Sequence, residues 1–96
     1  MLILVTYDVN TENDAGKKRL RKVANICEKY GQRVQNSVFE CILDAAQYVK
    51  VKADLVNAIK QQEDSLRFYQ LGNNYQNRVE HFGKTQGIEQ DSILIL

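Results

Sequence analysis

The 96-residue sequence has one histidine, two cysteines and no apolar run that approaches the length of a membrane-spanning helix. With one histidine, neither a serine–histidine–aspartate triad nor a histidine-rich zinc site fits within a single chain. The sequence also lacks the glycine-rich phosphate loop, the dinucleotide-binding fingerprint and the H-E-x-x-H motif of metalloproteases. These absences exclude several common enzyme classes and leave carboxylates as the side chains best suited to catalysis.

The two cysteines, Cys27 and Cys41, stand among apolar neighbours and lack the C-x-x-C spacing of redox and metal motifs. We therefore expect two buried, reduced thiols in a cytoplasmic protein. The longest apolar run covers residues 1–5, and the start of the chain has neither the basic region nor the cleavage site of a signal peptide. The sequence predicts no membrane association.

Hydrophobic residues make up 44% of the chain and charged residues 26%, which is typical of a globular protein. A chain of this length forms one domain with a small core, so dimerisation is a reasonable expectation. The net charge is only +1, but residues 17–33 hold seven basic side chains against one acid, Glu28. The basic residues are Lys17, Lys18, Arg19, Arg21, Lys22, Lys29 and Arg33. A local basic patch can bind phosphates, although a solvated helix face fits the charge count equally well.

Hydrophobic patterning predicts a first strand followed by a helix. Residues 1–7 are apolar and β-branched without alternation, which is typical of a central strand buried on both faces. From about Asp14 to Tyr30 the apolar residues recur at the helical period, after a capping residue within 10–14 and before a stop at Gly31. Gly16 lies on the same stripe, where its missing side chain would let the helix approach the sheet. The stripe consists of Leu20, Val23, Ala24, Cys27 and Tyr30.

The middle of the chain predicts β structure, a second helix and a further strand. Residues 33–43 are β-rich, but Asn36–Ser37 interrupts them, so a hairpin and one bent strand both remain open. Asp44 and Gln47 have the spacing of a capping box and begin the second helix. Residues 65–71 alternate as a strand does. Strand, helix, β segment, helix and strand in this order predict an α+β ferredoxin-like fold of split βαβ type.

A C-terminal segment of about residues 79–96 exceeds this fold. Residues 79–83 have strand character, and residues 92–96 form an apolar run that would be an aggregation hazard if it stayed unpaired. We expect a single domain over residues 1–96 whose last strand pairs with the sheet edge of a second subunit.

Asp8 is the carboxylate best placed for chemistry, because it closes the first strand directly before the loop that leads into the helix. Ligands of open α/β sheets gather at the carboxyl ends of the strands. One carboxylate cannot build a Mg²⁺ site, since this cation needs several oxygen ligands. Two copies of Asp8 facing each other across a dimer axis could do so, with waters as the remaining ligands. The alternatives are that Asp8 is a turn residue and that His81 acts as a general base.

Three features together resemble CRISPR-associated protein 2. They are Tyr7–Asp8 at the end of the first strand, the basic helix that follows, and the run R-x-Q-x-S-V-F over residues 33–39. The likeness extends over the whole chain, and residues 72–83 are similar to the branch associated with the I-C type of CRISPR system. The resemblance implies a homodimer that exchanges its last strands and works in spacer acquisition, as part of antiviral defence. It also implies a position between two dimers of the CRISPR-associated protein 1 integrase.

The same resemblance implies roles for individual residues. Asp8 would be the Mg²⁺ ligand of an endonuclease that acts on duplex DNA or on RNA. The implied contacts to nucleic acid are Arg19, Arg21 and Arg33 with Lys17 and Lys18 of the basic helix, and the residues bordering the cleft are Tyr7 and Phe39. The alternatives are a non-catalytic DNA-binding adaptor, a toxin-like endoribonuclease and, from the fold alone, a regulatory domain that senses small molecules.

Overall fold

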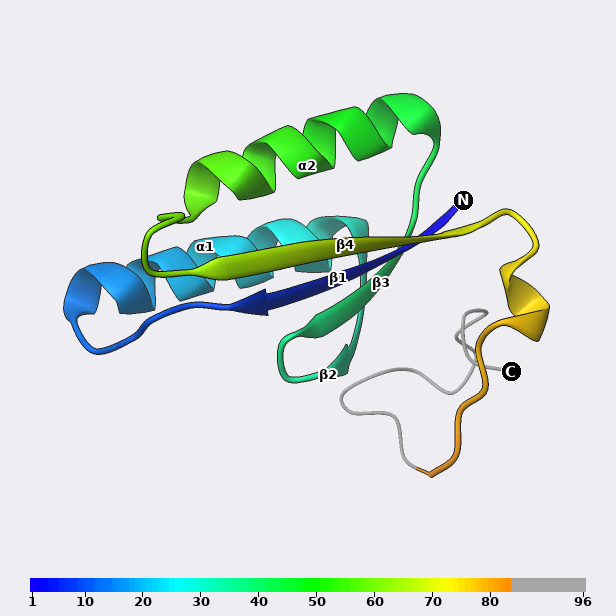
Figure 1. The fold of residues 1–96 in the computed structure, drawn as a ribbon, viewed down its shortest axis with the longest axis horizontal. Helices are drawn as coiled ribbons and strands as arrows, with labels where there is room; N and C mark the ends of the chain where they lie inside the picture. The colour runs from blue at the N-terminus through cyan, green and yellow to red at the C-terminus, as the bar shows by residue number, and fades with distance from the viewer. Residues whose placement is uncertain (84–96) are drawn as a thin grey trace.

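In the computed structural model, residues 1–83 are described, and they form four strands and two helices (Figure 1). The elements are β1 (Leu2–Asp8), α1 (Asp14–Tyr30), β2 (Gly31–Gln35), β3 (Val38–Ile42), α2 (Ala45–Ala58), β4 (Ser65–Gly72) and a 3-10 turn, η1 (Tyr75–Asn77). None of the helices described combines the length and apolar character that crossing a membrane requires.

The four strands form one antiparallel sheet in the order β2-β3-β1-β4. This order confirms the predicted ferredoxin-like fold and the central position of the first strand. Residues 33–43 belong to a hairpin, because β2 and β3 pair with each other on either side of Asn36–Ser37. The question that the sequence left open is therefore settled in favour of two strands.

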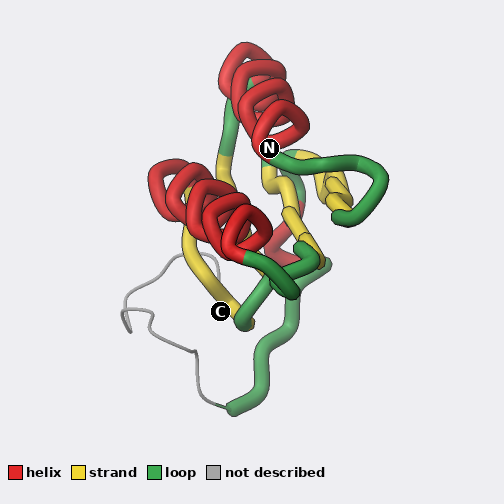
Figure 2. Tube along the Cα trace, turned by 90° about the vertical axis from the view of Figure 1, so that its left-hand side faces the viewer, coloured by secondary structure: helices red, strands yellow, loops and turns green. Residues whose placement is uncertain are grey.

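The core lies between one face of the sheet and the two helices, which run side by side (Figure 2). Alternate residues of β1 and β3 point into it, as expected for strands whose side chains alternate between faces. The sheet residues of this core cluster are Ile3, Val5, Tyr7, Phe39 and Cys41, and those of the helices include Val23, Cys27, Val51 and Leu55. Both cysteines are buried and unpaired, as the sequence predicts.

The helix ends combine predicted caps with one close approach of the backbone to a neighbouring strand. Asn13 caps α1 through a hydrogen bond from the backbone nitrogen of Gly16 (2.9 Å), and the capping box of Asp44 and Gln47 begins α2. Gly31 ends α1 as predicted, but its backbone is extended rather than left-handed. A Cβ at Gly31 would overlap the sulfur of Cys41 in the neighbouring strand. Close packing, not a special backbone conformation, therefore accounts for this glycine.

The segment after η1 differs from its predicted strand character. Residues 79–83 form neither strand nor helix. They run on the side of the sheet away from both helices, as Figures 1 and 2 show. A strand forms backbone hydrogen bonds with a neighbouring strand. This segment lies opposite the face of the sheet and not along one of its edges. The apolar run at residues 92–96 lies outside the described residues.

Candidate functional site

Asp8 is the last residue of β1, and its side chain is exposed. Backbone contacts hold this end of β1 from both sides. The backbone nitrogen of Tyr7 donates to the carbonyl of Ser37 (3.1 Å), and Asp8 pairs with Ser65 in the β1–β4 ladder. Within residues 1–83 its carboxylate makes no hydrogen bond and no ion pair. None of the described residues therefore occupies the carboxylate, and its exposure leaves it accessible to a ligand.

The surroundings of Asp8 decide whether one chain could hold a cation there. A shallow cleft runs between the loop after β1 and the loop before β4, and it is lined by Asp8, Asn10, Thr11, Glu12, Gln62, Glu63, Asp64 and Ser65. Among the residues described, no three histidine, cysteine or acidic side chains come together as metal ligands. The oxygen donor at Asp8 suits a hard cation such as Mg²⁺ in type but not in number. Further ligands would have to come from water or from a second molecule.

Arg33, Tyr7 and Phe39 form a second group of predicted site residues that lie together. The Arg33 guanidinium lies 4.7 Å from the centre of the Phe39 ring, which stacks on Tyr7 at 6.2 Å. Arg33 also pairs with Glu28 (3.0 Å) and donates to the carbonyl of Asn36 (2.6 Å). Burial raises the pKa of Tyr7, and the charge of Arg33 opposes that rise.

The position of the two rings differs from the expectation that they border a cleft. Phe39 is fully buried and Tyr7 is 5% exposed, so both rings belong to the core of this chain. A base could not stack on Phe39 without displacing its neighbours. Arg33 remains 30% exposed and is the member of this group that can reach a phosphate.

Arg19 is tied to a partner that the sequence did not reveal. Its guanidinium donates twice to the carboxylate of Asp64, from Nε at 2.8 Å and from a terminal nitrogen at 3.2 Å. The side chain of Asp64 is fully buried, and that of Arg19 is 17% exposed. These bonds, with two from backbone nitrogens, lower the pKa of Asp64 to about 2. Arg19 is therefore engaged inside the protein, whereas the resemblance implied a contact to nucleic acid.

The other basic residues of α1 face outward. Lys17, Lys18 and Arg21 are exposed, and their side chains make no ion pair or hydrogen bond within the described part of the chain. Lys17 and Arg21 are one helical turn apart, so their side chains lie next to each other. We call these three residues the basic surface of α1.

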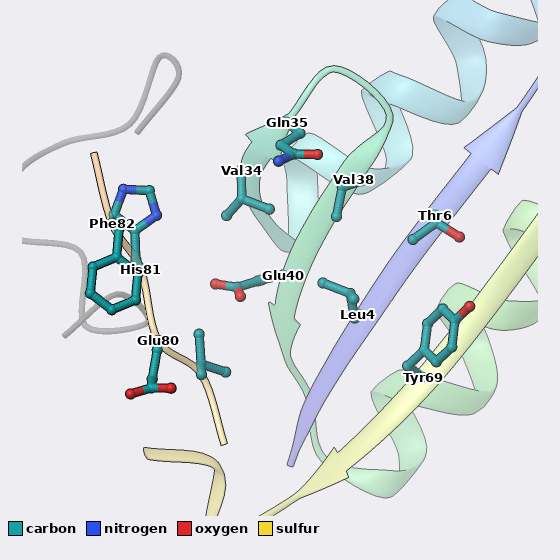
Figure 3. Close-up of a pocket in the computed structure, with 11 residues that line it drawn as sticks. Leu4, Thr6, Val34, Gln35, Val38, Glu40, Tyr69, Glu80, His81 and Phe82 are labelled. Carbon is teal, nitrogen blue, oxygen red and sulfur yellow. The ribbon is translucent and has the colours of Figure 1, made fainter. Parts of the chain in front are cut away.

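No helix or strand among the described residues covers the face of the sheet opposite α1 and α2, which we call the open face. It is lined by Leu4, Thr6, Val34, Val38, Glu40 and Tyr69, and the segment 79–82 stands across from it over a pocket of about 830 Å³ (Figure 3). Glu40 is only 5% exposed, and within residues 1–83 its Oε1 has no hydrogen-bond partner. Burial raises its pKa, and the charge of His81 opposes that rise. An apolar face with an unsatisfied carboxylate is typical of a surface that something else covers.

Asp64 and Glu40 are the two residues that sequence reasoning missed. Asp64 looks like an ordinary acid in a loop, and its partner Arg19 is 45 residues away in the sequence. Glu40 alternates outward from the core in β3, so its pattern predicts exposure. No local signal in the sequence marks either residue as buried.

The fold and the site define a small ferredoxin-like protein that presents one carboxylate at the end of its central strand, beside a helix with a basic outer surface. The family profile described as "CRISPR associated protein Cas2" matches residues 1–79. The chain therefore belongs to the CRISPR-associated protein Cas2 family, as the resemblance in its sequence predicts.

Individual relatives agree with this assignment. The chain is 55% identical to the "CRISPR-associated endonuclease Cas2" of Halalkalibacterium halodurans, over 99% of both chains. It is 56% identical to the "CRISPR-associated endoribonuclease Cas2" of Chlorobaculum tepidum, over all of both. The crystal structure of Streptococcus pyogenes Cas2 at pH 6.5 superposes with a TM-score of 0.75 at 59% identity, over 86% of this chain and 100% of the other. The names of the first two relatives are those of nucleases, in agreement with the predicted enzyme class.

Proposed function

We propose that this protein is a Mg²⁺-dependent nuclease that hydrolyses phosphodiester bonds as a homodimer, with Asp8 of each subunit holding the metal. The observation that carries the proposal is the Asp8 carboxylate, exposed at the end of the central strand and unpaired within the described residues. The names of the relatives, endonuclease and endoribonuclease, support the same class of reaction.

Two features favour a homodimer. One chain brings too few ligands to Asp8, since its described residues contain no cluster of three metal-binding side chains. The open face of the sheet carries apolar side chains and the orphaned Oε1 of Glu40, which a covering surface would shield or satisfy. A second copy of the chain would meet both needs at once, because it brings a second Asp8 and a second apolar face.

Different residues of the chain would have different roles in hydrolysis. Bound Mg²⁺ would supply a water of lowered pKa and a positive charge where the phosphate becomes more negative. Asp8 would hold the cation, and the basic surface of α1 with Arg33 would hold the phosphates on either side of the bond to be cut. These are contacts to the backbone of the nucleic acid, so we expect weak sequence preference.

Chelation of the metal tests the proposed reaction. Purified protein is expected to cut duplex DNA or RNA in Mg²⁺, to stop in EDTA, and to recover when Mg²⁺ is added in excess. Both substrates belong in the assay, because one relative is named an endonuclease and the other an endoribonuclease. Equal cleavage with and without EDTA would contradict metal dependence.

The basic surface of α1 is expected to set the salt dependence of binding. Log affinity falls as log salt rises, and each contact to a phosphate makes this slope steeper by about 0.9. Lys17→Ala with Arg21→Ala removes two contacts from each chain, so the slope of the dimer should become shallower by about 3.6. Lys50→Ala with Lys52→Ala is the matched control, because it removes the same charge from α2. The measurement is a salt titration of binding to a duplex of fixed length. An unchanged slope in the first variant would assign this helix face to solvent.

The role in spacer acquisition is part of the same proposal. A symmetric dimer would place two identical surfaces on either side of its axis, where two dimers of the CRISPR-associated protein 1 integrase could bind. A dimer that bridges integrases without cutting is the rival, and it predicts DNA binding that needs neither Asp8 nor Mg²⁺.

A further inference from the structure

Asp64 lies directly before β4, and its buried carboxylate joins three parts of the chain. Oδ2 accepts from the backbone nitrogen of Lys60 (2.8 Å), at the start of the segment between α2 and β4. Oδ1 accepts from the backbone nitrogen of Asn10 (3.0 Å), in the loop after β1. Arg19 of α1 donates to both oxygens. One side chain therefore binds the loop after β1, the loop before β4 and the helix between them.

The loop that Asp64 holds is the loop that carries Asp8. Asn10 follows Asp8 by two residues, and Ser65, which follows Asp64, is the partner of Asp8 in the β1–β4 ladder. Asn10 is restrained further because its Oδ1 accepts from the nitrogen of Glu12 (2.9 Å). The side chain of Asp8 makes no bond of its own within the described residues, so the backbone is the part of Asp8 that the fold holds in place.

We propose that Asp64 is a positioning residue, whose hydrogen bond to Asn10 fixes the backbone on which Asp8 presents its carboxylate to the metal. The inference rests on the proposed function, since it takes Asp8 as the metal ligand. It also gives Arg19 a role. The positive guanidinium compensates the negative charge of the buried carboxylate, so Asp64 stays ionised and can accept four hydrogen bonds.

The test measures metal binding and local backbone order instead of cleavage. Mn²⁺ serves as the probe, because carboxylate sites that suit Mg²⁺ accept it and its free form is visible by electron paramagnetic resonance. Asp64→Asn keeps the volume of the side chain but replaces one acceptor by a donor that faces the nitrogens of Asn10 or Lys60. We expect Mn²⁺ affinity to fall by about tenfold or more, as for residues that orient a ligand from behind.

Hydrogen exchange of the Asn10 amide gives a readout that does not depend on metal. The amide should exchange slowly in the wild type and at least about tenfold faster in Asp64→Asn. Asp54→Asn is the matched control, because it makes the same substitution at an aspartate that pairs with Lys50 at 3.1 Å and does not line the cleft of Asp8. Both readouts should stay within about twofold of the wild type in this control, since only a surface ion pair is lost.

The outcomes separate the two proposals. If the wild type binds Mn²⁺ and Asp64→Asn binds it equally well, the positioning role is wrong and the metal site stands. If the wild type itself binds no Mn²⁺, the proposed function fails and the positioning role fails with it. Should Asp64→Asn not fold, Asp64→Glu replaces it, because it keeps the charge for Arg19 while its longer chain displaces the bond to Asn10. Wild-type Mn²⁺ affinity in a folded Asp64→Glu would also overturn the inference.

Discussion

Gly16→Ala is expected to destabilise the protein by about 2 kcal/mol, although alanine is the better helix former. The steric cost of forcing a methyl group into a closed site is about 3 kcal/mol, and the gain in helix propensity is at most about 1 kcal/mol. The site is closed because a Cβ at Gly16 would overlap the backbone carbonyl of Asn10. Backbone cannot move aside as the end of a flexible side chain can, so the loop or the helix must shift.

The expected result is a fall in melting temperature of about 10 °C at equal protein concentration. Asn25→Ala is the control, because this residue is exposed on the same helix. Its helix propensity should raise the stability by about 0.5 kcal/mol. A stabilised Gly16→Ala protein would mean that the loop after β1 yields easily. The positions of Asn10 and Asp8 would then be less restrained than we describe.

Asp8→Asn is expected to lower Mg²⁺-dependent cleavage on the order of 100-fold or more, because the amide keeps the volume but not the charge that a hard cation needs. The fold should hardly respond. The side chain is exposed and unpaired within residues 1–83, so its replacement should change the stability by less than about 0.5 kcal/mol. The measurement is the initial rate of cleavage in the substrate that the wild type prefers.

Glu12→Gln is the matched control for Asp8→Asn. Glu12 is an exposed acid that lines the same cleft, but it lies in the loop and not at the end of the strand. The Glu12→Gln variant should cleave at the wild-type rate if the Asp8 carboxylate itself binds the metal, and not the overall negative charge of the cleft. Both variants are purified in the same way as the wild type, so a contaminating nuclease would show itself as activity in Asp8→Asn.

The sequence was sufficient for the elements because their signals are local. Asp44 and Gln47 are three residues apart, and the apolar stripe of α1 repeats within each turn, so neighbouring residues alone determine both features. The hairpin was harder to predict, because Asn36–Ser37 interrupts the β pattern equally in a hairpin turn and in one bent strand. Its reversal depends on β3 pairing with β1, a contact between residues more than 30 positions apart.

The site could be predicted only where its residues act alone. Asp8 stands out because it ends an apolar strand, and that signal needs no partner. The resemblance implies that Arg19 contacts nucleic acid, and the sequence alone does not show what this side chain meets in the folded chain. Its partner Asp64 comes from a loop 45 residues later, which only the assembled fold brings close. Long-range ion pairs of this kind leave no periodic trace in a sequence.

The structure also separates the basic residues by role. Arg19 binds Asp64 inside the protein, whereas Lys17, Lys18 and Arg21 are exposed and without a partner in the described part of the chain. A phosphate bound to α1 would therefore meet the flank that faces away from the loop before β4. The acids of that loop, Glu63 among them, would repel a phosphate from the opposite flank.

The central claim is that two subunits share one metal ion between their Asp8 carboxylates, and the stoichiometry of binding tests it most directly. Mn²⁺ would be titrated into protein of known chain concentration, with the free ion followed by electron paramagnetic resonance. We predict one tightly bound ion for every two chains in the wild type and none in Asp8→Asn. One ion per chain, or the same binding in Asp8→Asn, would contradict the shared site.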